Sequence, residues 1–199
     1  MKFKIFIFLV LNFSTGYSQN TLGNPTENSV KCYFDNSMSS LILYDAINGE
    51  KSKILNVSET GQKTQWFLIT VGQIKNDWVQ MKEISFFDLL GSIFKTDSIN
   101  RELSKNKGKW IKLDNLKINT PDISVPDSLG IPFYSEPDLN SEIICKSGTF
   151  LILRLLDVHE TWAKVSFTHN KINYMGWIEK ENQCAFPWTS CPFHGSTEN

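Results

Sequence analysis

One pattern of strand-like segments, marked by tryptophan at matching places, occurs twice in this chain. Three pairs of segments correspond: Leu43-Tyr44-Asp45 with Phe133-Tyr134-Ser135, residues 77–81 with 161–165, and Lys109-Trp110-Ile111 with Gly176-Trp177-Ile178. Around them lie short runs of β-branched and aromatic residues separated by turn residues, which is typical of small all-β barrels or sandwiches. A repeat constrains the fold more than any local signal does, because both copies are expected to fold in the same way. We therefore predict an all-β protein with two similar domains.

The N-terminus predicts export. Lys2 and Lys4 precede a continuous apolar run at 5–11, and small residues including Gly16 and Ser18 follow it. This is the pattern of a secretory signal peptide, residues 1–18, cleaved after Ser18. The run is too short for a permanent transmembrane helix, so we expect a secreted or periplasmic protein without a stable membrane anchor. A buried core helix is the alternative interpretation.

The charge balance argues against nucleic acid as a partner. The chain has 20 basic and 21 acidic residues. Without Lys2 and Lys4 the mature protein would have 18 basic residues against 21 acidic ones, a net charge of −3. Strong binding to nucleic acid requires a concentrated basic surface.

The composition along the chain predicts its domain boundaries. A polar, flexible arm at 19–29 precedes the first domain at 30–118, and a Pro- and Gly-containing linker at 119–130 leads to the second domain at 131–182. The tail is at 183–199. Residues 84–107 interrupt the first domain. Phe86, Phe87, Leu90, Ile93 and Phe94 recur there at helical spacing, which predicts a short helix packed on the domain and then an exposed loop. A docking surface is the alternative for this insertion.

The four cysteines are expected to reach an oxidising compartment, where disulfides persist. Four cysteines allow three pairings, and the sequence does not choose among them. We favour Cys184–Cys191, seven residues apart around Pro187, and a second bond between Cys32 and Cys145 that would tie the two domains together. A zinc site is the competing idea, but it would require ligand spacings that this sequence lacks. We predict no metal site.

The second copy resembles the bacterial SH3 (SH3b) domain family. It contains Phe133-Tyr134-Ser135-Glu136-Pro137, then Gly148, then Trp162-Ala163-Lys164-Val165, then Gly176-Trp177-Ile178. The first copy is looser, because Gly108 is displaced by one position and the insertion separates its last two strands. The tail around Cys184 and Cys191 and the signal ending in Ser18-Gln19 resemble those of exported proteins from Bacteroidetes-type bacteria. The resemblance implies two small SH3-like barrels in tandem, the first with a short helical insertion.

SH3b domains often accompany a domain that cuts peptidoglycan, and we find no residues for that chemistry. A cysteine peptidase requires a thiolate beside a histidine, yet Cys145 lies on a strand predicted to face inward. His159 and His169 fall in turns, where histidines usually face solvent. The acidic pairs Glu136/Asp138 and Asp157/Glu160 lie in loops predicted to be exposed. We therefore predict no catalytic residue and no cofactor.

A binding surface is the remaining expectation. SH3-like barrels present aromatic residues in shallow grooves that suit extended peptides, and Tyr44, Tyr134 and Trp188 are the candidates. The alternative is core packing for the two tyrosines and cover of a barrel end for Trp188. Four other tryptophans are predicted to fill the cores: Trp78, Trp110, Trp162 and Trp177. The predicted function is an exported, non-catalytic module that holds cell-wall peptide or a protein. The alternatives are a structural or accessory subunit of another exported protein and a cell-wall hydrolase.

Overall fold

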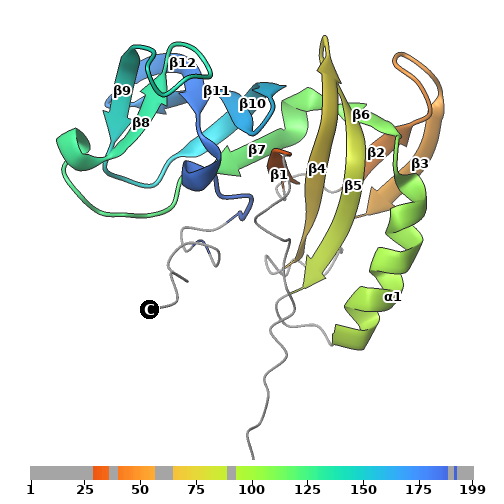
Figure 1. Cartoon of the computed structure of the whole chain (residues 1–199). Helices are drawn as coiled ribbons and strands as arrows, with labels where there is room; N and C mark the ends of the chain where they lie inside the picture. Colours follow the sequence, from red (N-terminus) through yellow and green to blue (C-terminus); the bar gives the residue numbers. More distant parts are fainter. Residues whose placement is uncertain (1–28, 36–39, 57–64, 89–92, 188–190, 192–199) are drawn as a thin grey trace, which may run out of the picture.

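The chain folds into antiparallel β-structure with one α-helix in the part that the structure describes (Figure 1). This computed structural model describes residues 29–35, 40–56, 65–88, 93–187 and 191. The strands are β1 (Lys31–Phe34), β2 (Ser40–Tyr44), β3 (Lys51–Asn56), β4 (Gln65–Lys75), β5 (Trp78–Asp88), β6 (Trp110–Lys112), β7 (Leu116–Asn119), β8 (Ile131–Tyr134), β9 (Ile143–Ser147), β10 (Ile152–His159), β11 (Trp162–His169) and β12 (Ile172–Ile178). The helix α1 spans Ile93–Leu103, and the short 3-10 helices are η1 (Ser104–Asn106), η2 (Leu113–Asn115), η3 (Asp127–Leu129) and η4 (Lys180–Asn182). The predicted all-β class is confirmed.

The strands form one hydrogen-bonded sheet, and the strand order of one half of the sheet mirrors that of the other half. The order is β3-β2-β6-β5-β4-β1-β7-β10-β11-β12-β8-β9. When β1 to β6 are matched with β7 to β12, each strand lies at the mirrored place of its counterpart. The strand order therefore repeats in six-stranded units, which we call the first unit (β1 to β6) and the second unit (β7 to β12).

The registers show that the match extends to single residues. In the hairpin β4–β5, Val71 pairs with Met81 and Gln73 with Gln80, so that Gly72 is an extra residue. In the hairpin β10–β11, Leu155 pairs with Val165 and Asp157 with Lys164, so that Leu156 is an extra residue. Residues 71–81 thus correspond to 155–165 without a gap. The turn residues Asn76 and Glu160 even share a positive φ of 53°.

Two short strands that the sequence did not predict join the units. β1 pairs with β4 and β7 pairs with β10, and β1 and β7 pair with each other through Tyr33–Lys117 and Phe34–Leu116. Buried apolar side chains from both units also form one continuous core. Since the pairing runs through both units, the closure of each into a separate barrel stays a prediction, as do the predicted domain boundaries. β7 covers the last residues of the predicted first domain and the first residue of the predicted linker.

The insertion in the first unit differs from its prediction. It does separate β5 from β6, but Phe86 and Phe87 belong to β5 rather than to a helix, and α1 begins at Ile93. Pairing with β4 prevails over the helical spacing, because Phe86 lies opposite Phe67 and Phe87 opposite Trp66, whose ring it stacks on at 5.0 Å. Asn100 to Asn106, expected in an exposed loop, instead continue the helix and form η1.

The segment that joins β7 to β8 packs against the rest of the second unit. The amide of Val125 donates to the carbonyl of Gly148, and the amide of Gly148 donates to the carboxylate of Asp127. A β-carbon at Gly148 would stand 1.7 Å from the Val125 carbonyl oxygen. Only glycine therefore allows this close backbone approach.

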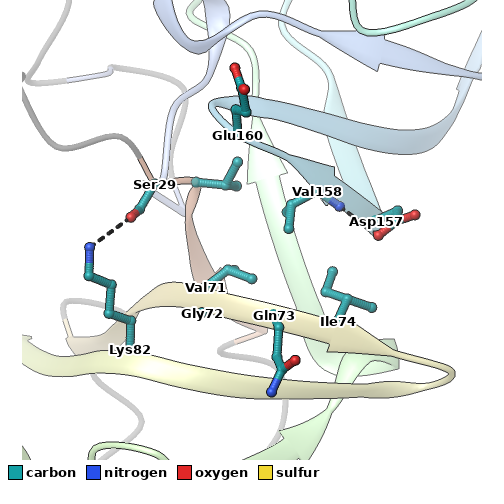
Figure 2. A pocket seen from close by; sticks show the side chains of 10 residues that line it. Ser29, Val71, Gly72, Gln73, Ile74, Lys82, Asp157, Val158 and Glu160 are labelled. Atoms are coloured by element: carbon teal, nitrogen blue, oxygen red, sulfur yellow. Dashed lines mark hydrogen bonds between the residues drawn. The ribbon is translucent and has the colours of Figure 1, made fainter.

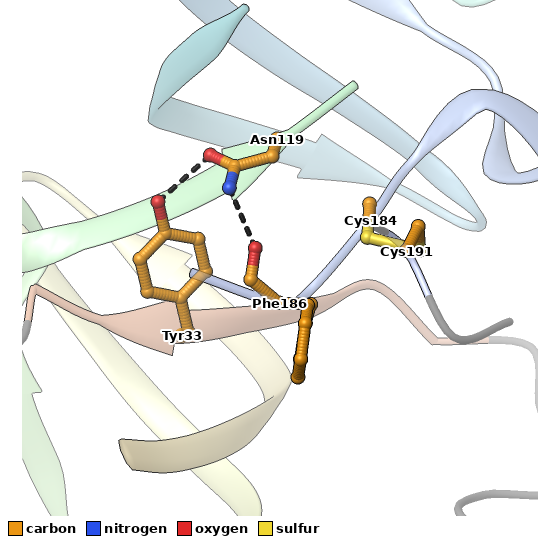
Figure 3. Close-up of a disulfide and its surroundings, with 5 residues drawn as sticks. All are labelled: Tyr33, Asn119, Cys184, Phe186 and Cys191. Carbon is orange, nitrogen blue, oxygen red and sulfur yellow. Dashed lines mark hydrogen bonds between the residues drawn. A yellow bond between two sulfur atoms is a disulfide. The ribbon is translucent and has the colours of Figure 1, made fainter. Parts of the chain in front are cut away.

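The C-terminal tail is bonded to the protein where β1 and β7 join the two units (Figure 3). The predicted disulfide Cys184–Cys191 is present, and Cys184 exchanges two backbone hydrogen bonds with Asn119 of β7. The buried amide of Asn119 accepts from the Tyr33 hydroxyl at 2.7 Å and donates to the Phe186 carbonyl. The Phe186 ring meets Trp66 edge to face at 5.1 Å. Tail, β1, β4 and β7 therefore form one buried contact region.

The predicted bond between Cys32 and Cys145 is wrong. Both cysteines are free. Cys32 lies on β1 and Cys145 on β9, and β7, β10, β11, β12 and β8 lie between these strands in the sheet order. The registers match Cys32 with Ile118 of β7, and both side chains are fully buried. Cys32 is thus a core residue, as free cysteines in proteins often are.

Candidate functional site

Each unit carries a cluster of one tyrosine and two tryptophans at corresponding places. Tyr44 ends β2 and pairs with Trp110 of β6, and Tyr134 ends β8 and pairs with Trp177 of β12. A bulge precedes each tyrosine, between Leu43 and Tyr44 and between Phe133 and Tyr134. The preceding side chain is fully buried in both units. The extra residue lies on the partner strand in both units, Ser52 of β3 and Ile144 of β9, so the same irregularity stands beside each tyrosine.

The ring contacts within the two clusters are nearly the same. Tyr44 meets Trp78 edge to face at 4.8 Å and 90°, and Tyr134 meets Trp162 at 5.4 Å and 88°. Edge-to-face contacts of this kind are favourable, because the positive edge of one ring lies over the negative face of the other. We call these the first and second aromatic clusters: Tyr44, Trp78 and Trp110 in the first unit, and Tyr134, Trp162 and Trp177 in the second.

A lysine lies over one tryptophan of each cluster. Lys112 Nζ is 3.8 Å from the centre of the Trp78 ring, and Lys164 Nζ is 5.6 Å from that of Trp177. Both tryptophans are buried, whereas Trp110 and Trp162 are half-buried. The tryptophans predicted to fill the cores thus flank the core, and Trp110 and Trp162 keep part of their surface accessible.

The predicted binding residues are not brought into one site. Tyr44 is half-buried and Tyr134 is buried, and they belong to different units. Burial, and the Glu179 carboxylate beside it, raise the pKa of Tyr134, so its hydroxyl stays protonated and able to donate at neutral pH. Trp188, the third predicted binding residue, lies outside the described residues.

A cleft opens between the two hairpins β4–β5 and β10–β11 (Figure 2). Its volume is about 470 Å³, within the range of about 300–1,000 Å³ that is usual for ligand sites. The apolar part of its lining consists of Val30, Val71, Ile74 and Val158. The polar part includes Ser29, Gln73, Lys82, Asp157 and Glu160.

Two pairs of corresponding residues line opposite walls of this cleft, Ile74 with Val158 and Gln73 with Asp157. Glu160 also lines it, whereas its counterpart Asn76 does not. The cleft was not predicted from the sequence, and Asp157 and Glu160 were predicted to lie in exposed loops. Both residues are indeed exposed, but they lie along one wall. A gap-free alignment of 71–81 with 155–165 was the available signal, although it could not reveal that the hairpins face each other.

The environment of His169 differs from the prediction. The side chain was expected to face solvent, yet it is only 8% exposed, and its Nε2 lies 2.9 Å from the Asp127 carboxylate. Asp127 also accepts from the Gly148 amide and from Asn170. The Gly148 amide and then His169 lower the pKa of Asp127. This group fixes η3 to the end of β11. His159 is exposed, as expected.

The free thiols lack the environment of a nucleophile. Burial raises the pKa of the Cys32 thiol strongly, and burial together with the nearby Asp127 carboxylate raises the pKa of Cys145. Cys145 is half-buried on β9 rather than directed fully inward. A reactive thiol requires a lowered pKa. The surroundings of Cys32 and Cys145 raise the pKa of both thiols instead.

The described residues carry neither a cluster of metal ligands nor a membrane-spanning helix. No group of three or more His, Cys, Asp or Glu side chains there is arranged to hold a metal ion. Among the described helices, none has the length and apolar character needed to cross a bilayer.

The comparisons with known proteins give distant structural likenesses only. No family model and no curated protein matches the sequence. The chain is similar to the structures of NlpC1 and NlpC2 from Trichomonas vaginalis at TM-scores of 0.30 and 0.29, with 12% and 13% identity. The match covers 81% of this chain in both cases, but only 47% and 49% of the respective solved chains. The chain thus spans about half the length of these proteins, and at such low similarity they carry no argument about its fold or function.

Proposed function

We propose that this protein is an exported, non-catalytic binding module with two SH3b-type barrels that holds a peptide of the cell wall. The observation that carries the proposal is the duplicated Tyr–Trp pair, Tyr44 with Trp78 and Tyr134 with Trp162. Packing of a hydrophobic core alone would not require both units to share the same edge-to-face geometry. It would also not require some of these rings to stay half-buried. Two partly accessible aromatic clusters offer flat apolar surface and polar ring atoms for an extended peptide.

The absence of a catalytic role is part of the proposal. All four cysteines have other assignments, because Cys184 and Cys191 form a disulfide and the pKa values of Cys32 and Cys145 are raised. His169 is engaged with Asp127. The disulfide is compatible with an oxidising compartment outside the cytoplasm, where such bonds persist.

Retention on purified, insoluble peptidoglycan tests the binding role. We expect the full mature chain to be retained, and the double variant Tyr44→Leu/Tyr134→Leu to lose affinity about tenfold, since each aromatic contact is worth about 0.5–1.5 kcal/mol. The double variant Tyr44→Phe/Tyr134→Phe is the matched control. It keeps both rings and should bind nearly as well as the unmodified protein.

The comparison is meaningful only if the Leu variants remain folded, which thermal unfolding followed by circular dichroism establishes. Failure of the folded, unmodified chain to bind peptidoglycan would contradict the cell-wall proposal and would favour a protein partner. Hydrolysis of peptidoglycan by the pure protein, lost on substitution of a cysteine or histidine, would contradict the non-catalytic role.

A further inference from the structure

The cleft between the hairpins β4–β5 and β10–β11 has opposite charges on its two walls. Lys82 stands on the wall of the first unit, and Asp157 and Glu160 stand on that of the second. Lys82 Nζ donates to Ser29 Oγ at 3.1 Å, and Asp157 Oδ1 accepts from the neighbouring Val158 amide. Figure 2 shows Lys82 and Asp157 on opposite sides of the apolar residues, with the Glu160 carboxylate directed away from them. Within the described part of the chain, none of the three charges forms an ion pair.

The duplication makes this charge difference informative. Since corresponding residues line both walls, the two walls would carry like groups if the units had remained alike. Instead, Asp157 and Glu160 stand where the first unit has the neutral Gln73 and Asn76. The two walls therefore differ in charge at these positions.

Lys82 has no counterpart at all. Thr70 pairs with Glu83 and Val71 pairs with Met81, so Lys82 is an extra residue at a second irregularity, which the hairpin β10–β11 lacks. Bulges commonly redirect a side chain toward a functional site. Here the bulge directs the one lysine of the lining into the cleft (Figure 2).

An apolar strip separates the charges. Val71, Ile74 and Val158 lie between Lys82 and Asp157, and Val71 and Val158 belong to different units. A ligand that satisfies all these groups has a carboxylate at one end, an ammonium group at the other and a small apolar part between them. We infer that the cleft binds the free termini of a short zwitterionic peptide. Its carboxylate would lie at Lys82 and Ser29, and its ammonium group at Asp157.

This second site goes beyond the proposed function, because it uses none of the residues of the aromatic clusters. The charged groups that face it are exposed, so the contribution of each is modest. An exposed pair of charges is worth about 0.2–1 kcal/mol, which corresponds to about 1.4-fold to fivefold in affinity.

The test is an NMR titration of the full mature chain with the dipeptide alanyl-alanine. We expect shifts of the amide signals of Gly72, Gln73 and Val158. The N-acetylated dipeptide and its C-terminal amide should each bind about twofold to fivefold more weakly. Lys82→Gln should weaken the free dipeptide but not the amide, and Asp157→Asn should weaken the free dipeptide but not the acetylated form.

Lys75→Gln is the matched control, since it removes a lysine of the same hairpin that does not line the cleft. It should leave binding unchanged. Absence of shifts up to the solubility of the dipeptide, or equal binding of the free and capped forms, would overturn the inference. The variant Tyr44→Leu/Tyr134→Leu should still bind the dipeptide, so failure of this site and failure of the peptidoglycan proposal are distinguishable.

Discussion

At the scale of single residues, Asn119 connects three parts of the molecule. Its side chain bonds Tyr33 of β1 and the Phe186 carbonyl of the tail, and it is fully buried. Loss of either partner leaves a polar atom buried without compensation, which costs more than the bond itself contributes. Polar groups in such a position fix one arrangement of the neighbouring elements.

Tyr33→Phe should therefore lower the free energy of unfolding by about 1–2 kcal/mol, since it removes only the hydroxyl and leaves Asn119 Oδ1 without its donor. Urea unfolding followed by circular dichroism measures the change. Tyr44→Phe is the control, because its hydroxyl lies in the half-buried first aromatic cluster. Equal stability of the two variants would contradict the role given to the Tyr33 hydroxyl.

Asp127 makes the stability of the folded protein depend on pH in the acidic range. Because its pKa in the folded protein is lowered from 3.8, the folded state favours the charged carboxylate more than the unfolded chain does. The stabilisation is present above the unfolded pKa and is lost as pH falls below 3.8 through the lowered value.

We therefore expect Asp127→Asn to lower Tm at pH 7, and the difference from the unmodified protein to shrink as pH falls below about 4. Asparagine keeps the size and can still accept from the Gly148 amide. Asp114→Asn, at an exposed carboxylate elsewhere, should show no such pH dependence. A Tm difference that stays constant down to pH 2 would rule out the carboxylate as its source.

At the scale of elements, α1 completes a strand that would otherwise present a free edge. β6 pairs with β5 only at Trp78, Val79 and Gln80. Farther along β5, the side chain of Asn100 accepts from the Phe86 amide at 2.6 Å and donates to the Phe86 carbonyl at 3.2 Å. The side-chain amide of this helix residue thus makes the two backbone hydrogen bonds that a neighbouring strand would otherwise make here.

Asn100→Ala should lower the free energy of unfolding by about 1–2 kcal/mol, through the loss of two hydrogen bonds. Amide exchange at Phe86 should also become faster, whereas exchange at Val79, which β6 covers, should be unchanged. Ser98→Ala, on an exposed position of the same helix, is the control. Unchanged exchange at Phe86 in Asn100→Ala would contradict this account.

The tail is the second element with a clear energetic role. Cys184 is buried and bonded to β7, and the disulfide closes a short loop to Cys191. Cys184→Ser/Cys191→Ser should destabilise the protein by about 2 kcal/mol. Cys145→Ser should have little effect on stability, since this half-buried cysteine is free.

A thiol assay provides the check on the pairing. Without reductant, the denatured protein should expose two reactive thiols, those of Cys32 and Cys145. Four thiols would refute the disulfide, and zero thiols would refute the free state of Cys32 and Cys145.

Local sequence signals predicted the elements unevenly. The hairpins were recognisable because Trp78 and Trp162 begin alternating strands after turn residues. The start of α1 was predicted too early in the chain, because Phe86 and Phe87 fit helical spacing. They fit equally well in a strand whose two faces both pack against aromatic rings. β1 and β7 are four residues each, too short to show a period. The two tyrosines were found from the repeat, whereas the cleft depends on contacts between distant segments.

At the scale of the whole molecule, the pairing of β1 with β7 makes the two units dependent on each other. The continuous core has the same effect. We expect one cooperative unfolding transition, with the calorimetric enthalpy equal to the van't Hoff enthalpy. Tryptophan fluorescence and far-ultraviolet circular dichroism should give the same midpoint. Two separate transitions would show instead that the units unfold as independent domains.

The mirrored strand order has a consequence for how such a chain could arise. Two separate copies of one six-stranded unit, joined edge to edge through their first strands, would form a symmetric homodimer with the same order. Fusion into a single polypeptide removes the dependence on protein concentration. It also frees each copy to change alone, so that the two walls of the cleft between the units can carry different charges, which identical subunits could not.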